Sequence, residues 1–67
     1  MEIWIRSQDK KKLVFAEEIV VMDCLIYAGD ILIGQYLTKE RALKVLDEIE
    51  TSITQGFSIY SMPKEEQ

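Results

Sequence analysis

The stretch TKERALKVLDEIETSITQG (residues 38–56) decides the fold, because it has a clear start, period and stop. Thr38 stands directly before the periodic run, where its hydroxyl can accept a hydrogen bond from a backbone N–H of the first helical turn. Apolar residues then recur with the spacing of one helix face: Ala42, Leu46, Ile49 and Ile53. Gly56 follows them and suits the left-handed position after a helix. The pattern predicts an α-helix over about residues 38–55.

The rest of the chain consists of short apolar or alternating runs, which are typical of β-strands. We expect strands over residues 2–6, 12–15, 19–22, 24–28 and 31–37, and a final strand over residues 57–62. Glu17 and Glu18 either bend one long strand or separate two. Gly29 and Asp30 form a two-residue hairpin connection, and Gly34 allows a neighbour to pack closely or marks a bulge.

A helix of this length needs a partner layer. Each fully buried Leu or Ile contributes about 1.5–3 kcal/mol, whereas fixing the backbone costs about 1–2 kcal/mol per residue. We therefore predict an α+β fold. It comprises a small antiparallel β-sheet of four to five strands, with the helix packed on one face and a final strand after it.

Length and composition indicate one small domain. The 67 residues, of which 48% are hydrophobic, predict a single domain over residues 1–63 and a polar tail over residues 64–67. A net charge of −4 argues against binding to nucleic acid, which is driven by phosphate neutralisation. Cys24 is the one cysteine, which fits a reducing compartment. The chain shows neither a signal peptide nor a membrane span, so we expect a cytoplasmic protein without a membrane partner.

The residue types that carry common enzyme chemistry are sparse. The chain has no histidine, the commonest general base and metal ligand. Cys24 therefore has no histidine to activate it and is interpreted as a small buried hydrophobe. The three glycines are isolated and form no phosphate-binding loop. We expect no catalytic residue, no metal and no cofactor, and hence a protein that is not an enzyme.

The predicted sheet has more apolar surface than one helix can cover. If Ile3 and Ile5 face the helix, Trp4 points away from it. Monomers seldom expose so large an apolar face, so we predict a homo-oligomer, with a two-fold dimer favoured. The residues predicted for this self-association or partner surface are Trp4, Arg6, Tyr36 and Tyr60. In the alternative, strong twist folds part of that surface back into a single core.

A few cationic side chains near structured elements are candidates for anion binding. The predicted contacts are Arg6, Arg41 and Lys44. The lysine run at residues 10–12 is interpreted as a solvated hairpin tip, with an anion-docking patch as the alternative.

Three stretches together resemble one protein family: WIRSQDK (residues 4–10), TKERALKVLDEI (residues 38–49) and YSMP (residues 60–63). They resemble short proteins of Gram-positive bacteria and of their phages and prophages. The resemblance implies a phage-associated protein that acts in the cytoplasm of a bacterial host. It assigns no functional residue, so Arg6, Gln8 and Asp9 either belong to a binding edge or hold the first hairpin.

Taken together, these features predict a small non-enzymatic oligomeric binding module of phage or prophage type. Its expected partner is a host protein, and a host-defence component is the candidate that the phage context suggests. One alternative is a sponge that sequesters a nucleotide signal at a subunit interface. Another is a structural or assembly subunit that binds a phage protein.

Overall fold

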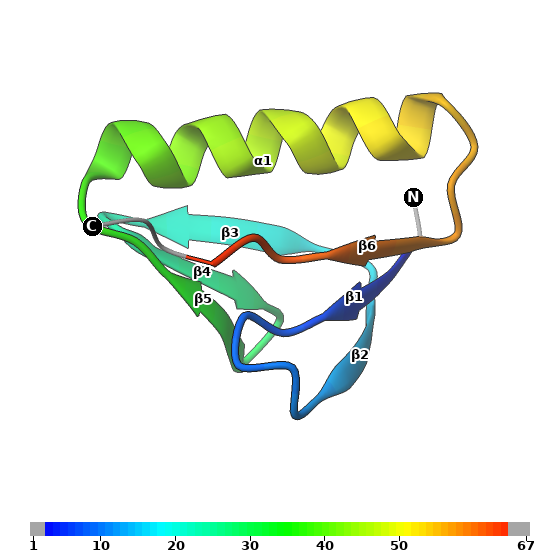
Figure 1. Cartoon of the computed structure of the whole chain (residues 1–67), viewed down its shortest axis with the longest axis horizontal. Coiled ribbons are helices and arrows are strands. Elements are labelled where there is room, and N and C mark those ends of the chain that lie inside the picture. The colour runs from blue at the N-terminus through cyan, green and yellow to red at the C-terminus, as the bar shows by residue number, and fades with distance from the viewer. Residues whose placement is uncertain (1–2, 65–67) are drawn as a thin grey trace.

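The computed structural model describes residues 3–64, which form six strands and one helix (Figure 1). In chain order they are β1 (Ile3–Arg6), β2 (Leu13–Ala16), β3 (Ile19–Met22), β4 (Leu25–Ala28), β5 (Ile31–Gln35), α1 (Lys39–Thr54) and β6 (Ile59–Ser61). The α+β class, the helix and the final strand after it are confirmed. Glu2, predicted in the first strand, and residues 65–67 of the predicted tail lie outside the described residues.

The strands form two sheets of three, in the orders β2-β1-β6 and β3-β4-β5, where one sheet of four to five strands was expected. β1 pairs antiparallel with β2 but parallel with β6, so the arrangement is not purely antiparallel. The chain leaves the first sheet at Ala16 and enters the second at Ile19. Glu17 and Glu18 therefore separate two strands and turn the chain from one sheet to the other.

The helix begins and ends as its sequence predicts. Thr38 Oγ1 accepts a hydrogen bond from the backbone N–H of Arg41 at 3.1 Å. At the other end Gly56 has a φ of +84°, and the N–H groups of Gly56 and Phe57 donate to the carbonyls of Ile53 and Ser52. This is a Schellman arrangement, which satisfies carbonyls that the helix leaves free.

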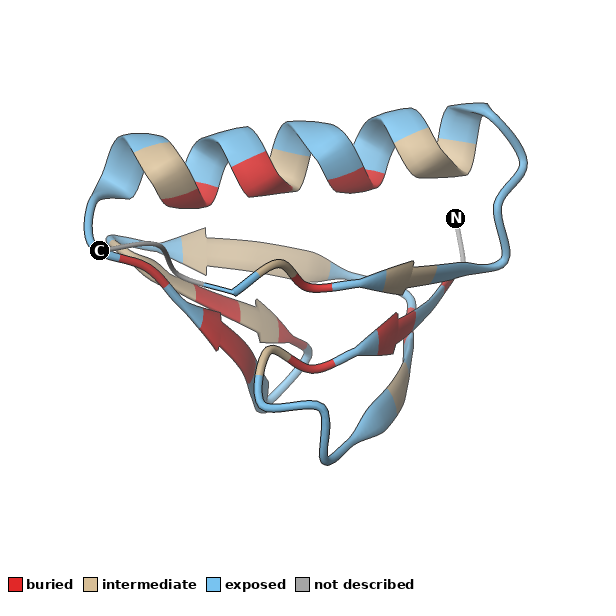
Figure 2. Ribbon diagram, viewed as in Figure 1, coloured by how far each residue is buried: buried red, intermediate tan, exposed pale blue. Residues whose placement is uncertain are grey.

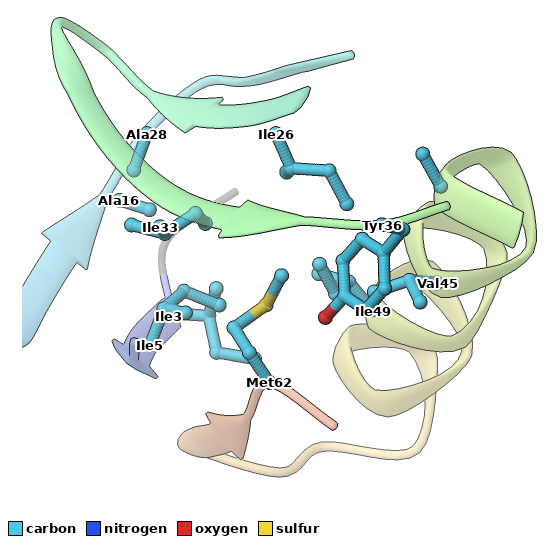
Figure 3. Close-up of a cluster of buried hydrophobic side chains, with 11 residues drawn as sticks. Ile3, Ile5, Ala16, Ile26, Ala28, Ile33, Tyr36, Val45, Ile49 and Met62 are labelled. Carbon is cyan, nitrogen blue, oxygen red and sulfur yellow. The ribbon is translucent and has the colours of Figure 1, made fainter. Parts of the chain in front are cut away.

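One core lies between the two sheets and beneath the helix. Figure 2 shows the buried residues of α1 on the side that faces the strands, and these residues are Ala42, Val45 and Ile49. Leu46 and Ile53, predicted on this face, are half-buried. In Figure 3, Met62 lies between Ile3 and Ile5 of β1 on one side and Tyr36 and Ile49 on the other. Further members come from β2, β4 and β5: Ala16, Ile26, Ala28 and Ile33.

Gly34 allows β5 to lie close to the end of the chain. A Cβ at this position would come 2.9 Å from the terminal methyl of Met62 and 3.0 Å from the ring of Tyr36. The expectation that this glycine permits close packing is therefore confirmed. The β4–β5 register also shifts between Ile26 and Tyr27, so the alternation along this part of the sheet is broken.

Gln8 joins the two sheets at the open edge of β5. Its side-chain carbonyl accepts from the N–H of Gln35 at 2.9 Å, and its amide donates to the carbonyls of Gln35 and Pro63. The Gln8 backbone N–H donates to Ile33 at 2.9 Å. Gln8 thus provides hydrogen bonds to β5 that a neighbouring strand would otherwise make, and it also bonds to the chain after β6.

Replacement of Gln8 by Ala should therefore destabilise the fold. Each lost hydrogen bond contributes about 0.5–1.5 kcal/mol, so we expect the free energy of unfolding to fall by about 1–3 kcal/mol. Urea denaturation followed by circular dichroism measures this change. Gln55→Ala, at the exposed end of α1, is the matched control and should have a small effect. Equal effects of the two substitutions would contradict the role assigned to Gln8.

Candidate partner-binding surface

An apolar row crosses the outer face of the β2-β1-β6 sheet. Trp4 lies opposite Phe15 of β2 on one side and opposite Ile59 of β6 on the other. Because Ile3 and Ile5 are buried in the core, the alternation of the strand points Trp4 away from it. The side chains of Trp4, Phe15 and Ile59 are 41%, 46% and 56% exposed. Trp4 is therefore on the outer face, as predicted.

The two aromatic residues of this row are in direct contact. The ring centroids of Trp4 and Phe15 are 5.0 Å apart, and the ring planes are tilted by 54°. Such tilted aromatic pairs are favourable beyond the area that they bury. Leu13 stands next to Phe15 on the same face of β2 and is 55% exposed. We call Trp4, Leu13, Phe15 and Ile59 the outer apolar face.

Three of these four residues were not among the predicted site residues. Leu13, Phe15 and Ile59 alternate with inward-facing neighbours, which is a visible signal in the sequence. Their assembly beside Trp4, however, depends on which strands pair with β1, and single-sequence patterns do not specify that pairing. The outer face of the other sheet also carries exposed apolar side chains, because Leu32 beside Tyr27 is 42% exposed and Met22 is 61% exposed, whereas Val20 and Tyr27 are half-buried.

Tyr36 does not belong to an exposed surface, and its prediction as a surface residue is wrong. The residue is 3% exposed and is part of the core. It lies just beyond the end of β5, after the register shift, so the strand alternation that placed it outside does not apply. Its hydroxyl donates to the carbonyl of Pro63 at 2.9 Å, which satisfies the polar tip of a buried ring.

Tyr60 also points inward, because it lies beside Ile5 in the parallel pairing of β1 with β6. It is half-buried against the core, and its hydroxyl donates to a carboxylate oxygen of Glu48 on α1 at 2.9 Å. Burial, together with the hydrogen bond to Glu48, raises the pKa of the Tyr60 phenol above its usual value of 10.0. Its prediction as part of an exposed partner surface is therefore corrected: Tyr60 connects β6 to the helix.

The predicted cationic residues do not meet within one chain. Arg6 lies on the outer side of its sheet, opposite the side that faces the helix, and donates to the carbonyl of Lys10 at 3.1 and 3.2 Å. Arg41 lies on α1, with its guanidinium carbon 5.6 Å from the ring centre of Tyr36. Lys44 is exposed on the same helix. A site that uses all three cations would need a second subunit.

Arg6, Gln8 and Asp9 were predicted either to form a binding edge or to hold the first hairpin, and the structure shows hydrogen bonds of the second kind. Ser7 Oγ donates to the Asp9 carboxylate at 2.5 Å, and the same carboxylate accepts from the N–H of Lys11 at 2.9 Å. These two hydrogen bonds lower the pKa of Asp9. Together with the contacts of Arg6 and Gln8, they favour a structural role for the loop over a binding edge.

The described residues hold neither a metal cluster nor a membrane-spanning helix. Within residues 3–64, no cluster of three acidic, cysteine or histidine side chains could hold a metal ion. The one helix of that range has neither the length nor the apolar content to span a membrane. No protein-family model, curated protein or solved structure matches the chain. The outer apolar face is the candidate site because two exposed aromatic rings, those of Trp4 and Phe15, contact each other on it.

The Tyr60–Glu48 contact predicts a loss of stability at high pH. Because the pKa of Tyr60 is raised on folding, its contribution is fully present below about pH 10 and is lost as pH rises further. In Tyr60→Phe, the decrease in the free energy of unfolding above about pH 10 should be smaller than in the wild type. Urea denaturation at a series of alkaline pH values measures this difference. Tyr27→Phe, on β4, is the control; an identical decrease in Tyr60→Phe and the wild type would contradict the assignment.

Proposed function

We propose that this chain is a small, non-enzymatic, oligomeric binding module of phage or prophage type that binds a host protein. The observation that carries the proposal is the exposed row Phe15–Trp4–Ile59 on the outer face of the β2-β1-β6 sheet. The row crosses three strands without a charged side chain, although 30% of the chain is charged. Protein interfaces have a core of this kind, which is poor in charge and rich in aromatic residues.

The arrangement of Trp4 suits the role of an anchor in such an interface. Tryptophan is enriched among the few residues that carry most of the binding energy. The contact with Phe15 restrains the Trp4 ring on a strand at the centre of its sheet, so little conformational freedom remains to be lost on binding. Arg6 and the lysine run at the hairpin provide charged groups at the border of the face.

The class of partner rests on the resemblance to proteins of Gram-positive bacteria and their phages. That context favours a protein of the bacterial cytoplasm, with a host-defence component as the candidate. The sponge for a nucleotide signal has weaker support, because Arg6 lies on the opposite side of its sheet from the helix that bears Arg41 and Lys44. A structural subunit would use the same apolar face and differs in having a phage protein as its partner.

The proposal predicts that Trp4→Ala abolishes partner capture while the fold persists. Tagged wild-type protein and variants would be used as bait in lysates of a Gram-positive host, with and without phage infection. Truncation of a central interface tryptophan costs about 2 kcal/mol or more, so we expect at least about thirtyfold weaker binding of the captured protein. Binding of the purified protein would then be measured by calorimetry.

Leu43→Ala is the matched control, because Leu43 is also 41% exposed but lies on α1, away from the outer apolar face. It should bind as the wild type does. If Trp4→Ala remains folded and binds with wild-type affinity, the proposed surface is wrong. If the captured protein is encoded by the phage, the module is an assembly subunit and the host-protein proposal fails.

A further inference from the structure

The edge of β2 differs from the edge of β5 in the other sheet. At β5, Gln8 bonds to both the N–H and the carbonyl of Gln35 and so closes the edge. β2 is an outer strand of its sheet, with β1 as its one hydrogen-bonded neighbour among the described strands. An open strand edge is a template for pairing with another chain unless proline, a bulge or an inward-pointing charge blocks it. The four residues of β2, Leu13–Ala16, contain neither a charge nor a proline.

The backbone groups at this edge can be identified from the register. The N–H of Ser7 donates to the carbonyl of Lys12, and hydrogen-bonded pairs alternate along an antiparallel ladder. Val14 and Ala16 therefore bond to β1, whereas the N–H and carbonyl groups of Leu13 and Phe15 point to the free edge. Four backbone groups in β-geometry are thus directed away from the sheet.

The charges that flank β2 are arranged with opposite signs at its two ends. Lysines occupy residues 10–12 before the strand, and Glu17 and Glu18 follow it. All five charged side chains are exposed. If two copies of β2 are aligned antiparallel about Val14, the lysine-bearing end of each strand lies beside the glutamate-bearing end of the other. Charges of opposite sign then lie near one another at both ends of the pair, so the segment is complementary to itself.

We propose that a second copy of this chain pairs with β2 along this edge. The two β2 strands run antiparallel about a two-fold axis at Val14, and the two sheets merge into one of six strands. Leu13 and Phe15 then exchange both backbone hydrogen bonds with Phe15 and Leu13 of the second copy. This inference rests on the oligomeric part of the proposed function and gives it a specific interface.

A groove of about 360 Å³ lies beside β2, between this strand and the β4–β5 turn, with Val14, Ala16, Ala28 and Ile31 among its lining residues. Gly29 at that turn has no side chain, and a Cβ there would meet nothing within 4 Å. Pairing would bring the exposed Leu13 and Phe15 of one copy beside those of the other, so that the two outer apolar faces become continuous.

The flanking charges could instead protect β2 from aggregation, but this role explains less well why lysines precede the strand and glutamates follow it. Charges beside an apolar strand oppose aggregation when copies that approach one another repel. In a parallel in-register pair, the lysine-bearing ends would lie together and so would the glutamate-bearing ends, and like charges repel. In the antiparallel pair, each end brings opposite charges together. The charge order therefore disfavours parallel stacking and selects the two-fold antiparallel dimer.

Charge reversal tests the interface. The double variants Glu17→Lys/Glu18→Lys and Lys10→Glu/Lys11→Glu each bring like charges together at both ends of the dimer. Because the repulsion acts at both ends, we expect self-association to weaken by about tenfold or more. An equimolar mixture of the two variants should form a heterodimer of wild-type affinity. Sedimentation equilibrium over a range of concentrations measures these constants, and circular dichroism verifies that each variant is folded.

Amide hydrogen exchange identifies the interface independently of any substitution. The N–H groups of Leu13 and Phe15 should exchange rapidly at low concentration and slowly at high concentration, because pairing buries them. The N–H of Val14 bonds to β1 and should be protected at both concentrations. This alternation along three successive residues distinguishes edge pairing from an association through side chains alone.

The outcomes separate this inference from the proposed function. A wild-type chain that stays monomeric, or a dimer that neither charge variant weakens, overturns the edge pairing. Neither result affects partner capture, which is measured with Trp4→Ala on β1. Loss of partner capture in Trp4→Ala together with an intact dimer supports both proposals. Rapid exchange of the Leu13 and Phe15 amides within a stable dimer would also overturn the edge pairing.

Discussion

A single core shared by three layers is the constraint on which this small fold depends. Each sheet has three strands and the helix has 16 residues, so no layer can bury its own apolar side chains. The helix contributes Ala42, Val45 and Ile49, and the inner faces of both sheets meet these residues. Met62 lies at the meeting point and is fully buried. Because a chain of this size buries a small share of its surface, the removal of any layer would leave the other two without a core.

The outer apolar face is exposed because the fold has only one helix to cover its two sheets in residues 3–64. One helix lies over the inner side of both sheets, and within residues 3–64 no second helix covers the outer sides (Figure 1). The residues that alternate with the core positions of β1, β2 and β6 then face solvent, although many are apolar. The outer apolar face and the open edge of β2 therefore have the same cause, which is the small number of elements in the fold. A partner or a second copy would supply the missing layer or strand.

The parts of this structure that depend on neighbours in sequence could be predicted, and the parts that depend on distant pairing could not. Thr38 and Gly56 mark the helix through local hydrogen bonds, and the position of Trp4 follows from the alternation along β1. The division into two sheets follows from the turn at Glu17 and Glu18, which fits one bent strand as well as two separate strands. Tyr36 was misplaced because a register shift and the end of β5 intervene. Tyr60 was placed on an exposed surface because its contact with Glu48 depends on the position of the helix, which the local pattern does not give.

The parallel pairing of β1 with β6 has a consequence for the order of events during protein synthesis. β1 is synthesised before the other described elements, yet one of its two neighbours, β6, is made only after the helix. The β3-β4-β5 sheet consists of two local hairpins, which can close while synthesis continues, because short loops have a low entropic cost. The backbone groups of Trp4 and Arg6 that bond to Ser58 and Met62 stay unpaired until those residues have been synthesised. Until then the nascent chain exposes both edges of the β1–β2 hairpin, and unpaired strand edges of this kind favour aggregation before synthesis is complete.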